Sequence, residues 1–142
     1  RDARDTCLSC YFQNFSAAGL TFAYDMDDLG HQYRLYEEMM KHWREVLPGR
    51  IYESQYEDLT TDPETYVPRL LEFCELEWNE RCLQFHKTKR DTKTASYDQV
   101  REPMYTKSVA RWHRYEKHLG PLFKALEGVE LVDPEKYLGK AK

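Results

Sequence analysis

The first nine residues, Arg1-Asp-Ala-Arg-Asp-Thr-Cys-Leu-Ser9, constrain the fold more than any other stretch of this chain. Their charged head runs directly into an apolar set at helical spacing, namely Leu8, Tyr11, Phe12 and Phe15. This pattern predicts a helix from about Asp5 to Ala17, capped by Asp5 or Thr6. We expect an anion at the start of this helix to meet free backbone amides and the positive end of the helix dipole.

Arg1 and Ser9 are the candidate ligands for that anion. The guanidinium of Arg1 offers a fork of donors, and the hydroxyl of Ser9, one to two turns inside the predicted helix, offers a single donor. Both can converge on one phosphate group. The alternative is a solvated charged loop followed by an ordinary capped helix, since runs such as RDxRD are common on surfaces.

Composition excludes several classes of protein. The 142 residues are 41% hydrophobic and 32% charged, which is typical of one soluble globular domain. No apolar run approaches the roughly 20 residues of a transmembrane helix. A formal net charge of −4 opposes a broad nucleic-acid surface, so a single-stranded nucleic-acid binder is the weakest interpretation. We therefore expect neither a membrane nor a nucleic acid as partner.

Four cysteines bear on metals and on the compartment. Cys74 and Cys82 lie eight residues apart, so they do not form a second metal-binding pair beside Cys7 and Cys10. The Cys7 and Cys10 thiols fall inside the first predicted helix, where core packing is the commoner role. We expect no metal, four reduced thiols and a cytoplasmic protein.

The rest of the chain is predicted to be mainly helical. A second helix begins at Asp27 or Asp28 and ends before Pro48-Gly49, with an apolar stripe that is expected to be core. Ile51 and Tyr52 begin the one predicted strand, which runs to Tyr56. Residues 57–59 then read as part of a turn.

Three further helices are predicted after this turn. One is capped by Asp62 with Pro63 in its first position, and a short one is capped by Asn79. Residues 86–103 lose apolar periodicity and are predicted to be a long loop, which at this length is usually functional or disordered. Ser108 is predicted to cap a final helix that carries Trp112 and Leu119.

Four motifs in this order resemble the sulfotransferases that use 3′-phosphoadenosine 5′-phosphosulfate (PAPS). The first is Arg1 to Ser9, which looks like the 3′-phosphate motif of that family. The second is Tyr56-Glu-Asp-Leu59, which follows a core strand in the relatives. The third, residues 94–105, resembles an S-x-x-Q-V-x-x-P segment that wraps the adenosine. The fourth is Ser108-Val-Ala-Arg-Trp112, where relatives place a basic residue before Trp.

The resemblance implies a set of cofactor-binding residues and a cofactor. The chain looks like the C-terminal half of bacterial sulfotransferases related to tyrosylprotein sulfotransferases, which often follow tetratricopeptide repeats. By this resemblance, the residues that bind PAPS or adenosine 3′,5′-bisphosphate would be Arg1, Ser9, Tyr56, Ser96, Gln99, Tyr105 and Arg111. Each also has a plainer interpretation: Tyr56 as a packing side chain, Ser96 and Gln99 as solvated loop residues, and Arg111 as a surface ion-pair partner. Lys107 competes with Arg111 for the phosphate role.

The implied parent fold is α/β, with a P-loop-like parallel sheet flanked by helices, and this chain would supply its mainly helical C-terminal portion. Residues 1–142 would then be part of one domain, with the 3′-phosphate motif at 1–9, a nucleotide-wrapping loop at about 86–107 and a helical part at 108–142. The implied activity is transfer of a sulfuryl group to a hydroxyl acceptor, either a small molecule or a peptide tyrosine.

The sequence departs from the family in two ways. Gln13 stands where some relatives have a second arginine, and no GxxxxGK or related phosphosulfate loop occurs. Glu57, Asp58 and the histidines could act as bases, but none matches the family position, so the catalytic residue is unknown. We expect this chain alone to be inactive and prone to form homo-oligomers. The alternative function is a non-catalytic helical interaction or assembly module.

Overall fold

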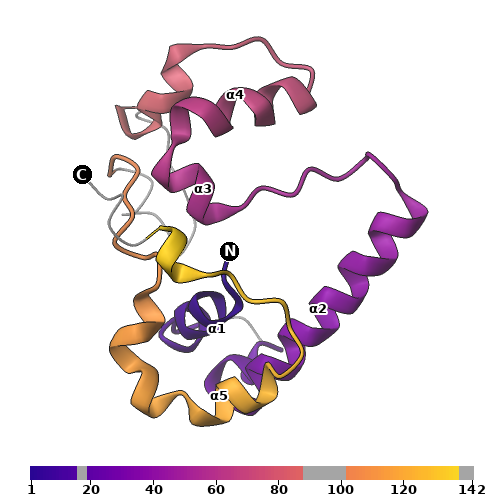
Figure 1. Cartoon of the computed structure of the whole chain (residues 1–142), viewed down its shortest axis with the longest axis vertical. Helices are drawn as coiled ribbons and strands as arrows, with labels where there is room; N and C mark the ends of the chain where they lie inside the picture. The colour runs from indigo at the N-terminus through magenta and orange to yellow at the C-terminus, as the bar shows by residue number, and fades with distance from the viewer. Residues whose placement is uncertain (16–18, 88–101, 138–142) are drawn as a thin grey trace. The chain divides into compact units, whose positions relative to one another are not determined.

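The computed structural model describes residues 1–15, 19–87 and 102–137, and over these residues it contains helices and turns but no β-strand (Figure 1). The described chain divides into two compact units. The first unit contains Arg1–Ile51 and the segment that begins at Ser108, and the second contains Tyr52–Lys107. The mainly helical prediction is confirmed, whereas the parent sheet stays a prediction.

The first unit is built on two α-helices that each begin at an aspartate cap. Asp2 caps α1 (Ala3–Tyr11), and Asp25 caps the long helix α2 (Met26–Val46) by accepting from the amides of Asp27 and Asp28. The short 3₁₀ helix η1 (Thr21–Tyr24) connects them. After Ser108 the unit continues with the 3₁₀ helix η4 (Arg111–His118), α5 (Gly120–Ala125) and the 3₁₀ turn η5 (Pro134–Lys136).

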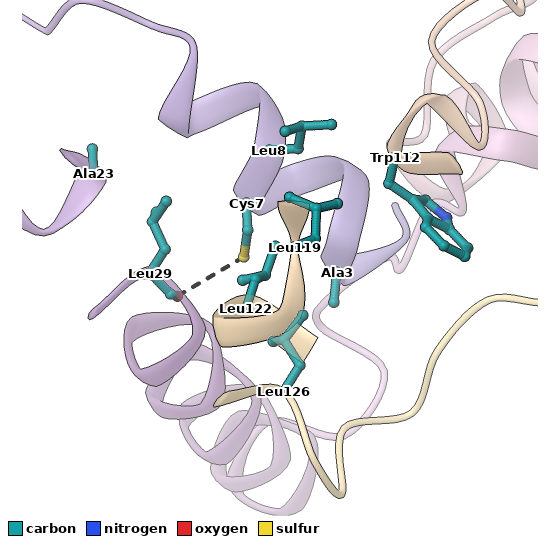
Figure 2. Close-up of a cluster of buried hydrophobic side chains, with 9 residues drawn as sticks. All are labelled: Ala3, Cys7, Leu8, Ala23, Leu29, Trp112, Leu119, Leu122 and Leu126. Atoms are coloured by element: carbon teal, nitrogen blue, oxygen red, sulfur yellow. Dashed lines mark hydrogen bonds between the residues drawn. The ribbon is translucent and has the colours of Figure 1, made fainter. Parts of the chain in front are cut away.

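The core of the first unit lies where α1, α2 and α5 meet (Figure 2). Its buried side chains come from both halves of the unit: Ala3, Cys7, Leu8, Ala23, Leu29, Trp112, Leu119, Leu122 and Leu126. The thiol of Cys7 lies 3.8 Å from the carbonyl oxygen of Leu29, inside this core as the sequence predicts. Gly30 lets α2 approach α5, because a Cβ there would lie 2.4 Å from the Cβ of Ala125.

The second unit contains α3 (Tyr56–Thr61), α4 (Pro63–Phe73) and the 3₁₀ helix η2 (Glu80–Lys87). Asp62 caps α4 with Pro63 in its first position, and the side chain of Asn79 accepts from the amide of Arg81. Both predicted caps are confirmed. Of the predicted loop at residues 86–103, His86 and Lys87 belong to η2, and residues 88–101 lie outside the described part of the chain.

The first helix is shorter than predicted and begins earlier. Its cap is Asp2 rather than Asp5 or Thr6, and it ends at Tyr11 rather than Ala17. Tyr24 explains the early end, because its hydroxyl lies 3.0 Å from both the amide nitrogen and the carbonyl oxygen of Phe15. These tertiary hydrogen bonds hold the backbone at Phe15 out of the helical ladder. The second helix is also capped earlier than predicted, at Asp25 rather than Asp27 or Asp28.

Three other predictions about local structure are wrong. The predicted strand at residues 51–56 is not a strand: the described backbone has no ladder there, and Tyr56 begins α3. An extended segment becomes a strand only when a neighbouring strand takes up its N–H and C=O groups. Residues 57–59 are helical rather than a turn. Ser108 caps no helix, since η4 begins at Arg111 behind Ala110, which has a left-handed backbone (φ 54°).

Candidate functional site

The start of α1 is occupied by a carboxylate of the chain itself. One carboxylate oxygen of Asp2 accepts from the amide of Arg4 at 2.9 Å and from the amide of Asp5 at 3.3 Å. These are first-turn amides, of the kind that a helix start offers to an external anion, whereas the amide of Thr6 at the predicted start already bonds to the carbonyl of Asp2. The prediction of free amides there is therefore wrong, and a phosphate near α1 would have to be held by side chains.

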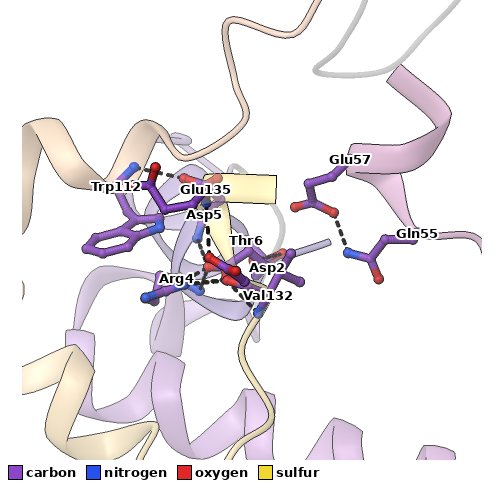
Figure 3. Close-up of polar contacts among 10 residues, drawn as sticks. Asp2, Arg4, Asp5, Thr6, Gln55, Glu57, Trp112, Val132 and Glu135 are labelled. Atoms are coloured by element: carbon purple, nitrogen blue, oxygen red, sulfur yellow. Dashed lines mark hydrogen bonds and ion pairs between the residues drawn. The ribbon is translucent and has the colours of Figure 1, made fainter. Parts of the chain in front are cut away.

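Asp2 and Arg4 also join α1 to the end of the described chain (Figure 3). The guanidinium of Arg4 makes a two-pronged ion pair with Asp2, at 3.0 and 2.7 Å, and donates to the carbonyl of Val132 at 2.9 Å. The amide of Val132 donates to Asp2 at 3.1 Å. Both charged side chains are largely buried, so solvent screens this pair little.

Asp5 joins α1 to η4. Its Oδ1 accepts from the amide of Trp112 at 2.8 Å, and the ring of Trp112 lies under the guanidinium of Arg4, 3.9 Å from its centroid. Burial raises the pKa of Asp5, although the bond to Trp112 and the charge of Arg1 oppose that rise. Its other oxygen, Oδ2, has no hydrogen-bond partner among the described residues. We call Asp2, Arg4, Asp5, Trp112 and Val132 the polar clamp.

A pocket of about 400 Å³ lies between α1 and α2, entirely within the first unit. Its walls are mainly apolar and aromatic, with Arg1 and Thr6 among its polar members: Arg1, Thr6, Cys7, Cys10, Phe22, Leu29, Gln32, Tyr33 and Tyr36. This volume falls in the range of small-molecule sites in proteins. Arg1 is half-buried, and its Nη2 donates to the carbonyl of Ser108 at 3.0 Å.

Burial in the pocket raises the pKa of two of its titratable side chains, Cys10 and Tyr33. Burial raises the pKa of the Cys10 thiol, and the positive charge of Arg1 acts against that rise. Burial also raises the pKa of Tyr33, and the nearby Glu37 carboxylate adds to the effect. Tyr33 is therefore a neutral hydrogen-bonding phenol at neutral pH. The charge of Arg1 makes this end of the pocket suitable for an anion.

Ser9 of α1 and Arg111 of η4 both lie outside the pocket. Ser9 is exposed and is not among the lining residues. Arg111 places its guanidinium over the ring of Phe12, 5.3 Å from the centroid. Phe12 follows Ser9 by three residues, so the two share one side of the helix. The structure thus places Arg111 beside Phe12 and does not bring Ser9 into the pocket with Arg1.

The remaining predicted site residues belong to the second unit. Tyr56 is the half-buried first residue of α3, and Tyr105 is half-buried with the ammonium of Lys107 4.3 Å from its ring centroid. Lys107 also pairs with Glu102 at 3.2 Å in an exposed position. Ser96 and Gln99 lie outside the described residues. The buried Glu57, one of the candidate bases, accepts a hydrogen bond from Gln55 (Figure 3).

Sequence reasoning missed the polar clamp. The motif RDxRD indicates charge, but it does not say that Asp2, Arg4 and Asp5 are directed inward toward residues more than a hundred positions away. One signal was available in the sequence: Asp2 and Asp5 flank Arg4 beside a helix start. An aspartate in this position can cap the helix and also form an ion pair with the arginine.

The described ranges hold neither a candidate metal site nor a candidate membrane helix. They contain no group of three or more histidine, cysteine or acidic side chains that could hold a metal ion. Among the helices of those ranges, none is long and apolar enough to cross a membrane.

Comparisons with known proteins identify the family. A model described as "Sulfotransferase family" matches residues 1–80, which include α1, α2 and α4. An uncharacterized protein of Aquifex aeolicus (strain VF5) is 47% identical over 139 residues, which are 95% of this chain and 18% of that relative. The chain thus spans less than a fifth of this relative's length, and no solved structure matches it significantly. On the family match, which covers more than half of its residues, the chain belongs to the sulfotransferase family.

Proposed function

We propose that this chain supplies the 3′-phosphate and adenosine side of a sulfotransferase site that takes its sulfuryl group from PAPS. The observation that carries the proposal is Arg1, which lies at the start of α1 and lines a pocket of ligand size beside aromatic rings. Arginine binds phosphate with a planar fork of donors. The family match includes this residue.

The residues present fit such a nucleotide in part. Arg1 and Thr6 would meet a phosphate, while Phe22, Tyr33 and Tyr36 offer flat apolar surface to a base. Ser9 of α1 and Arg111 of η4 lie outside this pocket, and we propose that they contact the part of the nucleotide that extends beyond it. Because Asp2 occupies the α1 amides, the phosphate contacts in this proposal come from side chains.

The bound nucleotide would supply the sulfuryl group, whose transfer resembles phosphoryl transfer in its dependence on positioning and charge stabilisation. Arg1 and Arg111 would stabilise negative charge on the nucleotide, and Tyr56, Ser96, Gln99 and Tyr105 would orient it. The acceptor is proposed to carry a hydroxyl, on a small molecule or a peptide tyrosine. No residue is assigned as the base. A cytoplasmic location and the closeness to tyrosylprotein sulfotransferase relatives belong to the same proposal.

A second candidate function is a helical interaction or assembly module without turnover. The observation that favours it is the exposed apolar surface on the C-terminal half of α2, where Leu35, Tyr36 and Met39 are each about half exposed. Such surfaces mark interaction sites on soluble proteins. Binding of a nucleotide distinguishes the two functions, because an assembly module has no need of it.

Calorimetric titration of the chain with adenosine 3′,5′-bisphosphate and with adenosine 5′-phosphate tests the nucleotide proposal. We expect Arg1→Ala to weaken the bisphosphate more than the monophosphate, by about tenfold or more for a lost charged contact. Ser9→Ala should weaken it by about 1 kcal/mol. Ser54→Ala, at an exposed serine of the second unit, is the matched control and should change neither affinity.

Two results would overturn the assignment. One is equal weakening of both nucleotides by Arg1→Ala, because a 3′-phosphate ligand must discriminate between them. The other is the absence of any bisphosphate binding to the folded chain, which would favour the assembly module.

A further inference from the structure

The C-terminal half of α2 is an apolar helix face that the first unit leaves uncovered. Only Leu29 and Gly30 of α2 are buried, and both lie in its first two turns against α1 and α5. Beyond them the helix extends past the rest of the first unit (Figure 1). Between residue 35 and the C-cap at residue 47, six large apolar residues are between 39% and 52% exposed: Leu35, Tyr36, Met39, Trp43, Val46 and Leu47.

These six side chains share one side of the helix. At 3.6 residues per turn, Tyr36, Trp43 and Leu47 form a narrow seam that continues the line of the buried Leu29, and Leu35, Met39 and Val46 widen that seam on one flank. We call these six residues the α2 seam. They form one contiguous apolar patch instead of scattered single side chains, and such patches often mark interaction sites.

Charged residues border the α2 seam on its other flank and change sign along the helix. Glu37 lies on that flank one turn before Lys41, and Arg44 follows after another three residues. Two copies of α2 that cross in antiparallel orientation between Met39 and Met40 would place Glu37 of one copy near Lys41 and Arg44 of the other. The same crossing brings Tyr36 opposite Trp43. In an antiparallel pair the two matching flanks face each other, so both charge contacts occur twice.

A parallel pairing fits these charges less well. In a parallel pair, opposite flanks face each other, so the flank with Glu37 and Lys41 would lie against the apolar flank with Met39 of the other copy. These charges would then face apolar side chains instead of opposite charges. In the antiparallel arrangement the two helix dipoles lie side by side and point in opposite directions, which is favourable.

We propose that the α2 seam binds a second copy of this chain, forming an antiparallel, two-fold symmetric pair of α2 helices. The occupant is an identical chain because the α2 seam is complementary to itself in charge and in the pairing of its aromatic residues. This inference needs no nucleotide, rests on the surface that favours the assembly module, and shares Tyr36 with the pocket. Titration of Met39→Glu with adenosine 3′,5′-bisphosphate separates the two, because loss of the dimer should leave nucleotide binding intact.

Sedimentation velocity of the whole chain over a range of concentrations tests the proposal. We expect a monomer–dimer equilibrium that Met39→Glu weakens roughly a hundredfold or more, because it places two charges at the centre of the dry seam. The side chain of Met39 is 52% exposed, so the substitution should leave the helical circular dichroism of the monomer unchanged. Lys124→Glu, a reversal of an exposed charge on α5, is the control and should leave the dimer intact.

Charge reversal tests the orientation. Lys41→Glu should weaken the dimer roughly tenfold, since symmetry counts each new Glu37 contact twice. The double variant with Glu37→Lys should restore part of this loss, because the exchanged pair attracts again while the contact with Arg44 becomes repulsive. A chain that stays monomeric at high concentration, or a dimer that tolerates Met39→Glu, would overturn the proposal. A dimer that Lys41→Glu leaves unchanged would overturn the antiparallel arrangement.

Discussion

The two units differ in how they are held together. Every buried apolar side chain of the described residues lies in the first unit, which also contains the polar clamp. In the described part of the second unit the apolar side chains are at best half-buried: α4 has no buried residue, and Tyr52 meets Phe73 with their ring centroids 5.2 Å apart. Since apolar burial is the main stabilising term, the first unit should be the cooperative body and the second the weaker one.

The largest expected difference between the two units is the loss of stability when one leucine in each is truncated to alanine. Leu122→Ala removes a fully buried side chain and should lower the free energy of unfolding by about 2–5 kcal/mol. Leu70→Ala in α4 removes a half-buried one and should cost about 1 kcal/mol. Urea unfolding followed by circular dichroism measures both. A larger loss for Leu70→Ala would mean that the second unit has the more important core.

Thiol chemistry compares the same two regions without mutation. Burial raises the pKa of Cys7 to about 12, whereas Cys74 of the second unit is exposed. Only thiolates react, so iodoacetamide at pH 8 should modify Cys74 faster than Cys7 by roughly a hundredfold or more. Mass spectrometry of peptides from timed samples gives both rates, and urea-unfolded chain is the control in which they converge. Similar rates in the folded chain would contradict the burial of Cys7.

The polar clamp can be compared with an ordinary helix cap. Asp2 caps α1 and also binds Arg4 and Val132, whereas Asp25 caps α2 from an exposed position. Asp25→Ala should cost about 1 kcal/mol of stability, and Asp2→Ala about 2 kcal/mol more, since it leaves a largely buried Arg4 without its carboxylate partner. Equal costs in urea unfolding would show that the polar clamp adds nothing beyond the cap.

The smallest expected effect concerns Asp5 and pH. Its pKa is raised above the ordinary value of 3.8, so its stabilising contribution is complete below that value and is lost as pH rises through the raised pKa. Asp5→Asn keeps an oxygen for the amide of Trp112 and removes the ionisation. The stability of the wild type relative to Asp5→Asn should therefore fall on going from pH 3 to pH 7, as measured by urea unfolding. If the stability of the wild type relative to Asp5→Asn instead rose with pH, the pKa of Asp5 would be lowered and not raised.

Local signals in the sequence predict much of this fold. Asp62-Pro63 and Asn79 predicted helix starts correctly because capping depends on neighbours two or three residues away. The early end of α1 and the inward role of Asp5 were not predictable, because Tyr24 and Trp112, which decide them, act from distant positions. The apolar stripe of α2 predicted a core helix, yet only its first turns are covered. Periodicity says which face is apolar and not what covers it.

The sequence also predicted one part of the candidate site and missed another. The family match over residues 1–80 supports the sulfotransferase interpretation of the first motif, and Arg1 does line a pocket. That Arg1 lines the pocket whereas Ser9 and Arg111 do not could not be read from spacing, since it depends on how the helices pack. Nor could the sequence show that Asp2 accepts hydrogen bonds from first-turn amides of α1, where an anion would otherwise bind.

The most direct test of the central claim, that the first unit binds a 3′-phosphorylated nucleotide at α1, is a titration of the ¹⁵N-labelled chain with adenosine 3′,5′-bisphosphate, followed by amide NMR shifts. We predict saturable shifts at Thr6, Ser9 and Cys10 on α1 and at Tyr33 and Tyr36 across the pocket, with smaller shifts for adenosine 5′-phosphate at equal occupancy. Shifts confined to the second unit, or no saturable shifts on α1, would contradict the account.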